Sequence, residues 1–300
     1  MRTRHPCPGF GKRVVMTERR DIAIEANGER LAAWLYPQSA PCPLIIMSHG
    51  FSALMAMGLD DYATVFASAG LAVLVYDHRN YGVSSGWPRN ETDPWQQVED
   101  MRAVISYGRN LPFVDKDRIG LWGTSYAGGH ALTVSSQDNR VSCVVSQVPL
   151  VSGQRNFDAW VPEKSRPRFM ERLAEDRDGR ARGELPVVTP AAIPGSETAE
   201  WVEAVDQEGI YPNEITLRSL DLMRSYEPIS FIKGVAPTPL LMVVADKDTQ
   251  TPVVWQREAF ELAGEPKKLV TLSGRHYDPY TRLLEESGEA ALDWFKNHLL

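Results

Sequence analysis

Five short, largely apolar runs alternate with segments of helical periodicity, and this alternation limits the fold more than any other feature of the sequence. The runs are LIIM (44–47), LAVLVYD (71–77), RIGLWG (118–123), VSCVVSQVP (141–149) and PLLMVVAD (239–246). Such runs are typical of strands buried on both faces of a parallel sheet. Apolar residues at helical spacing follow several of them, as at 60–69, 126–136 and 253–263. The pattern predicts an α/β fold with a mostly parallel central sheet flanked by helices.

The chain before these runs predicts an antiparallel hairpin. RDIAIEA (20–26) alternates in polarity and ends at Asn27-Gly28, a pair that favours a two-residue hairpin turn. The run from Arg30 to Tyr36 is then the second strand. Residues 1–16 show no periodicity, and we expect them to form an N-terminal arm.

The segment between the fourth and fifth apolar runs is too long for an ordinary connection. About 90 residues separate Pro149 from Pro237, whereas a crossover between parallel strands needs on the order of a dozen or more. Helical patterns lie within this segment, at about 198–208 and 215–225. We therefore predict a helical cap (lid) inserted at 151–235 into a core domain that comprises 17–150 and 236–300.

Composition excludes several classes of function. The 300 residues carry 32 basic and 39 acidic side chains, a formal net charge of −7, so no nucleic-acid partner is expected. No run approaches the ~18 consecutive apolar residues of a membrane span. Three cysteines (Cys7, Cys42 and Cys143) form no disulfide framework, and no apolar stretch follows the basic N-terminus. We expect a cytoplasmic protein with no membrane partner, and a homodimer is left open.

The strongest local signal is GTSYAG (123–128), which lies between a predicted strand and a predicted helix. A sharp strand-to-helix turn of this kind strains the backbone of the serine and exposes its hydroxyl above the sheet. Small residues are needed on either side because the strand and the helix approach closely. Ser125 is therefore the candidate nucleophile, with an inert serine in a tight turn as the alternative.

A second signal, SHGF (48–51), follows the apolar strand LIIM directly. Acyl transfer builds negative charge on an oxygen, and a backbone N–H group aimed at that oxygen contributes about 3 kcal/mol. We predict that the amides of Phe51 and Tyr126 form this oxyanion hole. His49 is then a structural residue of its loop.

Two further loops carry an acid and a base. Asp248 follows the strand PLLMVV and precedes the helix-initiating Pro252, which places its carboxylate where it could orient a histidine. Asp246 is the competitor, and capping of the following helix is the alternative role. His276 lies on the loop after KKLVTLSG (267–274), the last predicted strand, where it could act as general base toward a serine and then as general acid.

These signals together resemble a known family. The order Ser125, Asp248, His276 is that of serine α/β-hydrolases. The loop DHRNYGVSSG (77–86) resembles the D-x-R-G-x-G-x-S-x-G loop of dienelactone hydrolase-like and X-prolyl dipeptidyl-peptidase-like esterases, although Asn80 replaces a glycine. VSQVPLVSG and GRHYDPY are similar to segments of a group that includes polyketide acyltransferases. The resemblance implies an α/β-hydrolase fold and a Ser-His-Asp triad.

The resulting hypothesis is a serine hydrolase that cleaves a carboxylic ester or thioester of a small to medium apolar acyl group. Trp160, Trp201 and Tyr226 are predicted substrate contacts in the cap. The alternatives are an acyltransferase that passes a polyketide-type acyl group to an alcohol, a C–C bond hydrolase, and a non-catalytic binding module. No cofactor is implied, and the sequence holds no HExxH or CxxC metal motif.

Overall fold

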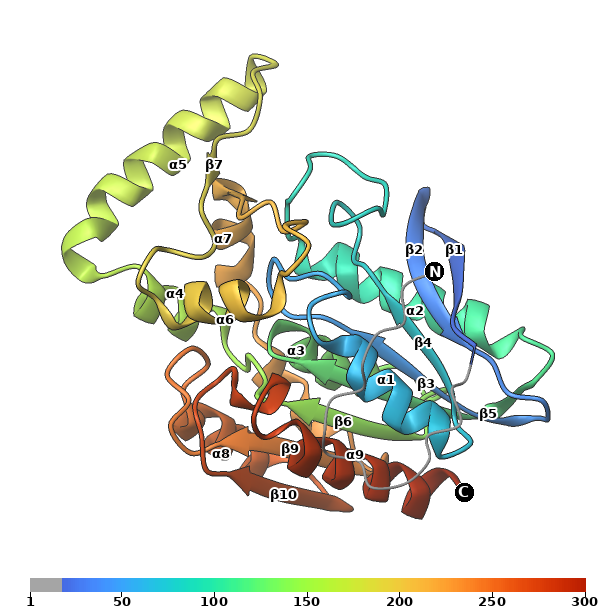
Figure 1. Cartoon of the computed structure of the whole chain (residues 1–300). Helices are drawn as coiled ribbons and strands as arrows, with labels where there is room; N and C mark the ends of the chain where they lie inside the picture. Colours follow the sequence, from blue (N-terminus) through green and yellow to red (C-terminus); the bar gives the residue numbers. More distant parts are fainter. Residues whose placement is uncertain (1–17) are drawn as a thin grey trace.

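A mixed eight-stranded sheet forms the centre of the molecule in a computed structural model that describes residues 18–300 (Figure 1). The strand order is β1-β2-β4-β3-β5-β6-β9-β10, and the six strands from β4 to β10 in this order are parallel. The strands are β1 (Arg20–Ala26), β2 (Glu29–Tyr36), β3 (Cys42–Ser48), β4 (Ala72–Tyr76), β5 (Val114–Thr124), β6 (Cys143–Gln147), β9 (Leu240–Ala245) and β10 (Lys267–Leu272). The predicted hairpin is confirmed, since β1 and β2 pair antiparallel from Arg20 with Leu35 to Ala26 with Glu29.

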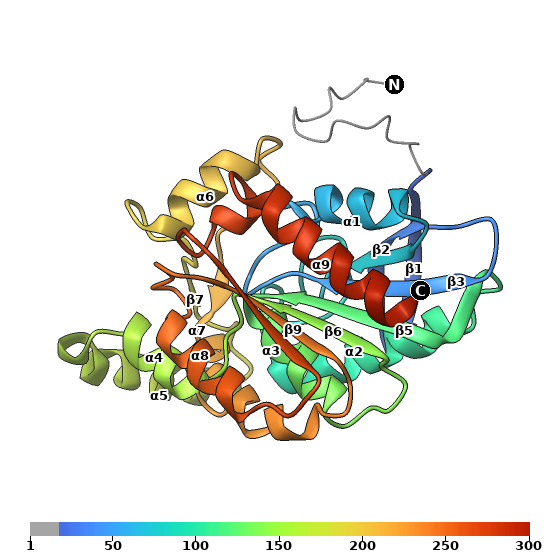
Figure 2. The same cartoon turned by 90° about the horizontal axis from the view of Figure 1, so that it is seen from below.

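Helices cover both faces of the sheet, as Figure 2 shows. One face is covered by α1 (Leu59–Ser68) and α9 (Leu284–Leu299), and the other by α2 (Pro94–Arg109), α3 (Tyr126–Ser135) and α8 (Val253–Leu262). The strands are apolar along their length because side chains on both faces meet a helical layer. The predicted fold class, a mostly parallel α/β sheet, is confirmed.

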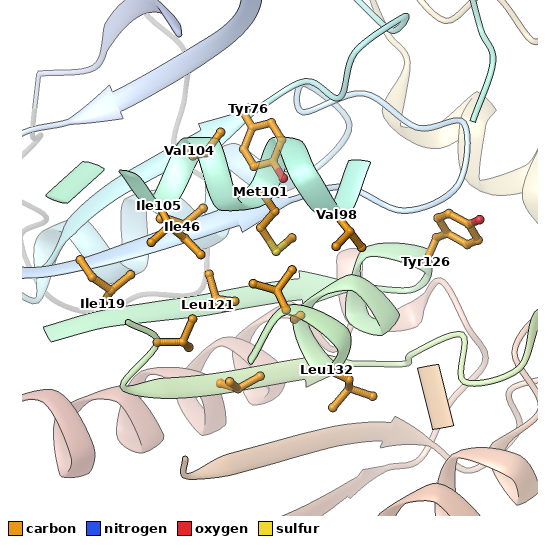
Figure 3. Packing of buried hydrophobic residues seen from close by; sticks show 14 of the residues in the cluster. Ile46, Tyr76, Val98, Met101, Val104, Ile105, Ile119, Leu121, Tyr126 and Leu132 are labelled. Atoms are coloured by element: carbon orange, nitrogen blue, oxygen red, sulfur yellow. The ribbon is translucent and has the colours of Figure 1, made fainter. Parts of the chain in front are cut away.

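The packing under α2 illustrates this burial. Figure 3 shows Val98 and Met101 of α2 against Ile46 and Leu121 of the sheet, and all four belong to one buried cluster. The helix begins at Pro94, and the Asp93 side chain caps it by accepting hydrogen bonds from the backbone amides of Trp95 and Gln96.

The segment between β6 and β9 is mostly helical and lies beyond the carboxyl ends of the parallel strands (Figures 1 and 2). Its elements are α4 (Gly153–Trp160), α5 (Arg166–Ala181), β7 (Val188–Thr189), α6 (Glu197–Val205), β8 (Ile215–Thr216) and α7 (Leu217–Arg224). Short 3₁₀ turns lie at Glu163–Ser165, Pro228–Ser230 and Ile232–Gly234, and another, η4 (Asp278–Tyr280), precedes α9. The antiparallel pair β7–β8 was not predicted. We refer to residues 151–235 as the insertion.

The N-terminal arm of residues 1–16 lies outside the described residues. Within residues 18–300, no helix combines the length and the apolar character needed to cross a membrane.

The 77–86 loop is closely folded, and its departure from the family pattern is accommodated. Asn80 has φ 71°, the left-handed conformation that asparagine tolerates better than most residues. Its Nδ2 donates to the Glu91 carbonyl at 2.9 Å. Gly86 has φ 119°, and a Cβ there would lie 2.2 Å from Asn80 Oδ1 and 3.1 Å from the Asn80 amide nitrogen, so backbone conformation and close approach both favour glycine. The loop resemblance therefore corresponds to a structural role, and asparagine replaces glycine without loss of the turn.

Candidate active site

Ser125 lies in the sharp turn between β5 and α3 that the sequence predicts. Its backbone has φ 55° and ψ −118°, a region that non-glycine residues rarely occupy. A Cβ at Gly123 would lie 2.0 Å from the Ala127 carbonyl oxygen, and one at Gly50 would lie 2.9 Å from the Ser125 Cβ. The small neighbours are therefore required by close backbone approach, and this strained turn presents the hydroxyl at the carboxyl end of the sheet.

His276 comes from the loop after β10 and bridges the serine and an aspartate. Its Nε2 lies 3.1 Å from Ser125 Oγ, and its Nδ1 lies 2.8 Å from Asp248 Oδ2. The imidazole is 2% exposed and Asp248 is 3% exposed. The structure thus brings together the three predicted residues with the spacing that proton transfer from serine to histidine requires.

The two candidate aspartates have different partners. Asp246 is exposed and accepts hydrogen bonds from the Gly274 amide at 2.9 Å and the Ser273 hydroxyl at 3.3 Å, so it braces the backbone of the histidine loop. Asp248 contacts the imidazole itself. The helix-capping alternative is wrong for both, since α8 follows Pro252 without a side-chain cap.

Sequence reasoning missed two residues that hold Asp248. Its Oδ1 accepts the amides of Gln250 and Thr251 at 2.9 and 3.0 Å. Its Oδ2 accepts from the side-chain Nε2 of Gln256 and from the Thr251 hydroxyl, each at 2.9 Å. Thr251 and Gln256 are therefore positioning residues for the carboxylate. The spacing D-x-x-T was a signal for Thr251, whereas Gln256 reaches back from α8 and had none.

The predicted oxyanion donors come from two different segments, the first turn of α3 and the loop after β3. Tyr126 is the first residue of α3, where an amide has no carbonyl one turn earlier to bond and where the helix dipole favours negative charge. Phe51 follows β3, and its ring meets the Tyr126 ring at a centroid distance of 5.2 Å. Both positions are compatible with the predicted oxyanion hole, which stays a prediction.

Three buried histidines contact one another, since the His78 ring lies at centroid distances of 4.5 Å from His49 and 5.6 Å from His130. His49 Nδ1 donates to the Gly50 carbonyl at 3.0 Å, and its Nε2 accepts the His78 amide at 3.1 Å, so the ring is neutral. His130 bonds the Tyr226 hydroxyl at 2.8 Å and Gln97 Oε1 at 2.9 Å. Burial lowers the pKa of His49 and of His78, and it lowers the pKa of His130 to about 3. His49 is thus structural, as predicted.

These pKa shifts predict a stability loss in acid. An unfolded histidine has a pKa of about 6.5, so below that pH the unfolded state binds a proton that folded His130 does not. We therefore expect the free energy of unfolding to fall as the pH drops below 6.5. His130→Gln removes one proton from this linkage and should reduce the slope of the free energy of unfolding against pH by about 1.4 kcal/mol per pH unit. Urea unfolding at pH 7.0, 6.0, 5.5 and 5.0 measures this difference. Asp77, whose pKa burial raises, contributes equally to both proteins. Equal slopes in the two proteins would contradict the prediction.

A cavity of about 280 Å³ opens above Ser125 and His276. The predicted contacts Trp160 and Trp201 line it. Tyr226 does not: it is fully buried in the main core, where its hydroxyl contacts His130 and Thr133. The prediction for Tyr226 is therefore wrong, because its hydroxyl is bonded to buried side chains of α3 and does not reach the cavity. Within residues 18–300, no group of three or more metal-ligating side chains is arranged to hold an ion.

Comparisons with known proteins agree with this fold. The model of the X-Pro dipeptidyl-peptidase family (S15) matches residues 27–277. A polyketide transferase of a Penicillium species is 32% identical over 291 residues, which cover 94% of this chain and 97% of the relative. A thiohydrolase of Eupenicillium brefeldianum is 30% identical over 279 residues, covering 88% and 89%. The crystal structure of the α/β hydrolase GrgF from Penicillium superimposes with a TM-score of 0.85 at 29% identity, covering 94% of this chain and 99% of the other.

Proposed function

The chain belongs to the X-Pro dipeptidyl-peptidase (S15) family of α/β-hydrolases, and from that premise we propose that it is a serine hydrolase that cleaves a carboxylic ester or thioester. The observation that carries the proposal is the chain of contacts from Ser125 Oγ to His276 Nε2 and from His276 Nδ1 to Asp248 at the base of the cavity. In this scheme Ser125 attacks the acyl carbon as its proton passes to His276. The imidazolium then protonates the leaving alcohol or thiol.

Asp248 keeps Nδ1 of His276 protonated, so that Nε2 is free to accept the serine proton. The amides of Phe51 and Tyr126 stabilise the oxyanion of the tetrahedral intermediate. Water then attacks the acyl-enzyme on the same face, and His276 acts first as base and then as acid.

The lining of the cavity favours an ester or thioester over a dipeptide. The free amino terminus of a peptide carries positive charge, and a buried cation needs a paired anion. The residues of the described chain that line the cavity include no aspartate or glutamate, and most are apolar or aromatic. An uncharged apolar acyl group suits this lining. The thiohydrolase relative supports thioesters as one substrate class.

Release of product from matched acyl donors tests the proposal. We expect the purified protein to cleave p-nitrophenyl esters and acyl thioesters, with an optimum at short to medium chains because the cavity is small. Chain lengths from two to twelve carbons, assayed alongside the Ser125→Ala variant, locate that optimum. Equal release by the variant, or no covalent acyl adduct on Ser125 by mass spectrometry, would contradict the proposal.

Acyl transfer is the second candidate, and one observation favours it. The relative from Penicillium is a polyketide transferase. The acyl-enzyme is common to both reactions, and only the identity of the attacking hydroxyl differs. A cavity that excludes bulk water would favour an alcohol over water as the acceptor.

A further inference from the structure

The two walls of the cavity belong to different parts of the molecule. Phe51, Trp160 and Leu220 pack against the large apolar cluster that runs under α3. The opposite wall belongs to a separate cluster, which consists of Ala53, Leu54, Met57, Tyr81 and Trp201, with Tyr211 and Tyr277 packed against it. In Figure 2, α6 lies on the side of α1 and α9, whereas α4 lies on the side of α8. We call the part of the cavity lined by Phe51, Trp160 and Leu220 the first lobe, and the part lined by Trp201, Tyr211 and Tyr277 the second lobe. Ser125 lines the same cavity as both.

Hydroxyl groups gather on the second wall. Ser52 Oγ and the Tyr211 hydroxyl lie 3.0 Å apart, and the Tyr277 hydroxyl donates to Thr198 Oγ1 at 2.9 Å. All four residues line the cavity. Each pair holds two hydroxyl hydrogens and needs one for the bond between its members. The second hydrogen of each pair can be donated to a polar group in this lobe.

The first wall has a different character. Phe51 and Trp160 meet at a ring-centroid distance of 5.6 Å, and Val161 and Leu220 extend the apolar surface. The indole nitrogen of Trp160 donates to the Gln250 carbonyl at 2.9 Å. This wall therefore offers carbon surface to a ligand and suits an apolar chain.

The imidazole of His276 lies beside the hydroxyl-bearing wall of the cavity. Its Nε2 gives a proton to the leaving group and takes one from the acceptor, so both groups must lie beside the imidazole. The rings of His276 and Tyr277 form a T-shaped contact at a centroid distance of 4.8 Å, and the Trp201 ring stacks on Tyr277 at a centroid distance of 4.7 Å. The hydroxyl-bearing wall thus adjoins the histidine.

We infer that the second lobe, which is lined by Trp201, Tyr211 and Tyr277, binds a hydroxylated alcohol as acyl acceptor. The first lobe, at Phe51 and Trp160, then binds the acyl chain. This inference rests on the proposed acyl-enzyme at Ser125, which hydrolysis and acyl transfer share. The alcohol oxygen bonds to the acyl carbon as its proton passes to His276 Nε2. The bond from that carbon to Ser125 Oγ then breaks, and the proton returns to Ser125. No oxidant, reductant or metal takes part.

Partitioning of one acyl-enzyme between alcohol and water tests the inference. A p-nitrophenyl ester supplies the acyl group, and butan-1-ol and butane-1,4-diol serve as acceptors of equal chain length that differ by one hydroxyl. We expect transfer to the diol to exceed transfer to butanol. Thr198→Val removes the hydroxyl that accepts from Tyr277 and holds the free hydrogen. The double variant Ser52→Ala/Tyr211→Phe removes both hydroxyls of the other pair. Each should lower that selectivity by about three- to tenfold, the effect of one lost hydrogen bond. Ester and acid products are quantified by mass spectrometry.

The ratio of ester to acid is measured within molecules that acylate, so a misfolded fraction of a variant does not affect it. Thr271→Val, on the exposed face of β10, is the matched control and should keep the wild-type ratio. Trp160→Ala should shift the acyl-length optimum and leave the preference for the diol intact. Unchanged selectivity in both Thr198→Val and Ser52→Ala/Tyr211→Phe overturns the inference, as does hydrolysis without any ester product. Absence of Ser125 acylation in the wild type would instead overturn the proposed function itself, and this inference with it.

Discussion

Ser125→Ala is expected to lower kcat for ester and thioester cleavage by about 10⁴- to 10⁶-fold, the largest effect of any single change in this protein. The variant lacks the oxygen that forms the acyl-enzyme, so only the oxyanion donors and the binding surface are left to assist attack by water. Initial rates of p-nitrophenol release, with the enzyme concentration raised for the variant, measure the loss. Mass spectrometry should find an acyl adduct in the wild type alone.

The fold of the Ser125→Ala variant should be preserved. The backbone of Ser125 keeps its own bonds, since its amide donates to the Gln147 carbonyl at 2.8 Å and its carbonyl accepts from Leu150 at 2.9 Å. Alanine meets the same strained φ, so the free energy of unfolding should change by less than about 1 kcal/mol. Ser136→Ala, on the residue that follows α3, is the matched control and should retain wild-type turnover. A variant at Ser125 that turns over at the wild-type rate would remove the serine from the mechanism.

Local pattern was sufficient for the sheet wherever a strand is buried on both faces. The runs at 44–47, 71–77 and 239–246 became β3, β4 and β9 with shifts of at most two residues. β5 is the exception, since it begins at Val114, four residues before the predicted strand. Val114 pairs with Cys42 across a register shift, and that contact spans 72 positions in the sequence. Long-range pairing of this kind leaves no local signal.

The same distinction separates the predictable and unpredictable parts of the site. Ser125 and His276 lie in turns whose geometry is set by neighbours in the sequence, so their motifs were informative. The cavity walls depend on how the insertion packs on the core. Trp160 and Tyr226 are both aromatic residues of the insertion, yet one lines the cavity and the other is buried against α3. Composition alone could not tell them apart.

Asp248→Asn is expected to lower kcat by about 10³- to 10⁴-fold, because the substitution changes the tautomer of His276. Two backbone amides, from Gln250 and Thr251, donate to Oδ1 and so require an oxygen there. The asparagine NH₂ group is then placed at Oδ2, facing His276 Nδ1. An imidazole that accepts at Nδ1 carries its proton on Nε2 and cannot take the proton of Ser125. Pre-steady-state acylation rates across pH 6 to 9 measure this loss directly.

Asp246→Asn is the matched control, and its expected effect is a few-fold at most. Its carbonyl oxygen can still accept the Gly274 amide, the stronger of the two bonds that brace the histidine loop. Both variants replace aspartate by asparagine on the same loop and remove one negative charge, so the change in net charge cannot explain a difference between them. A large loss at Asp246 with a small one at Asp248 would reassign the acid. Because the wild-type contacts of the two residues differ in kind, imidazole against backbone, the ratio of their effects measures how far acylation depends on the histidine tautomer.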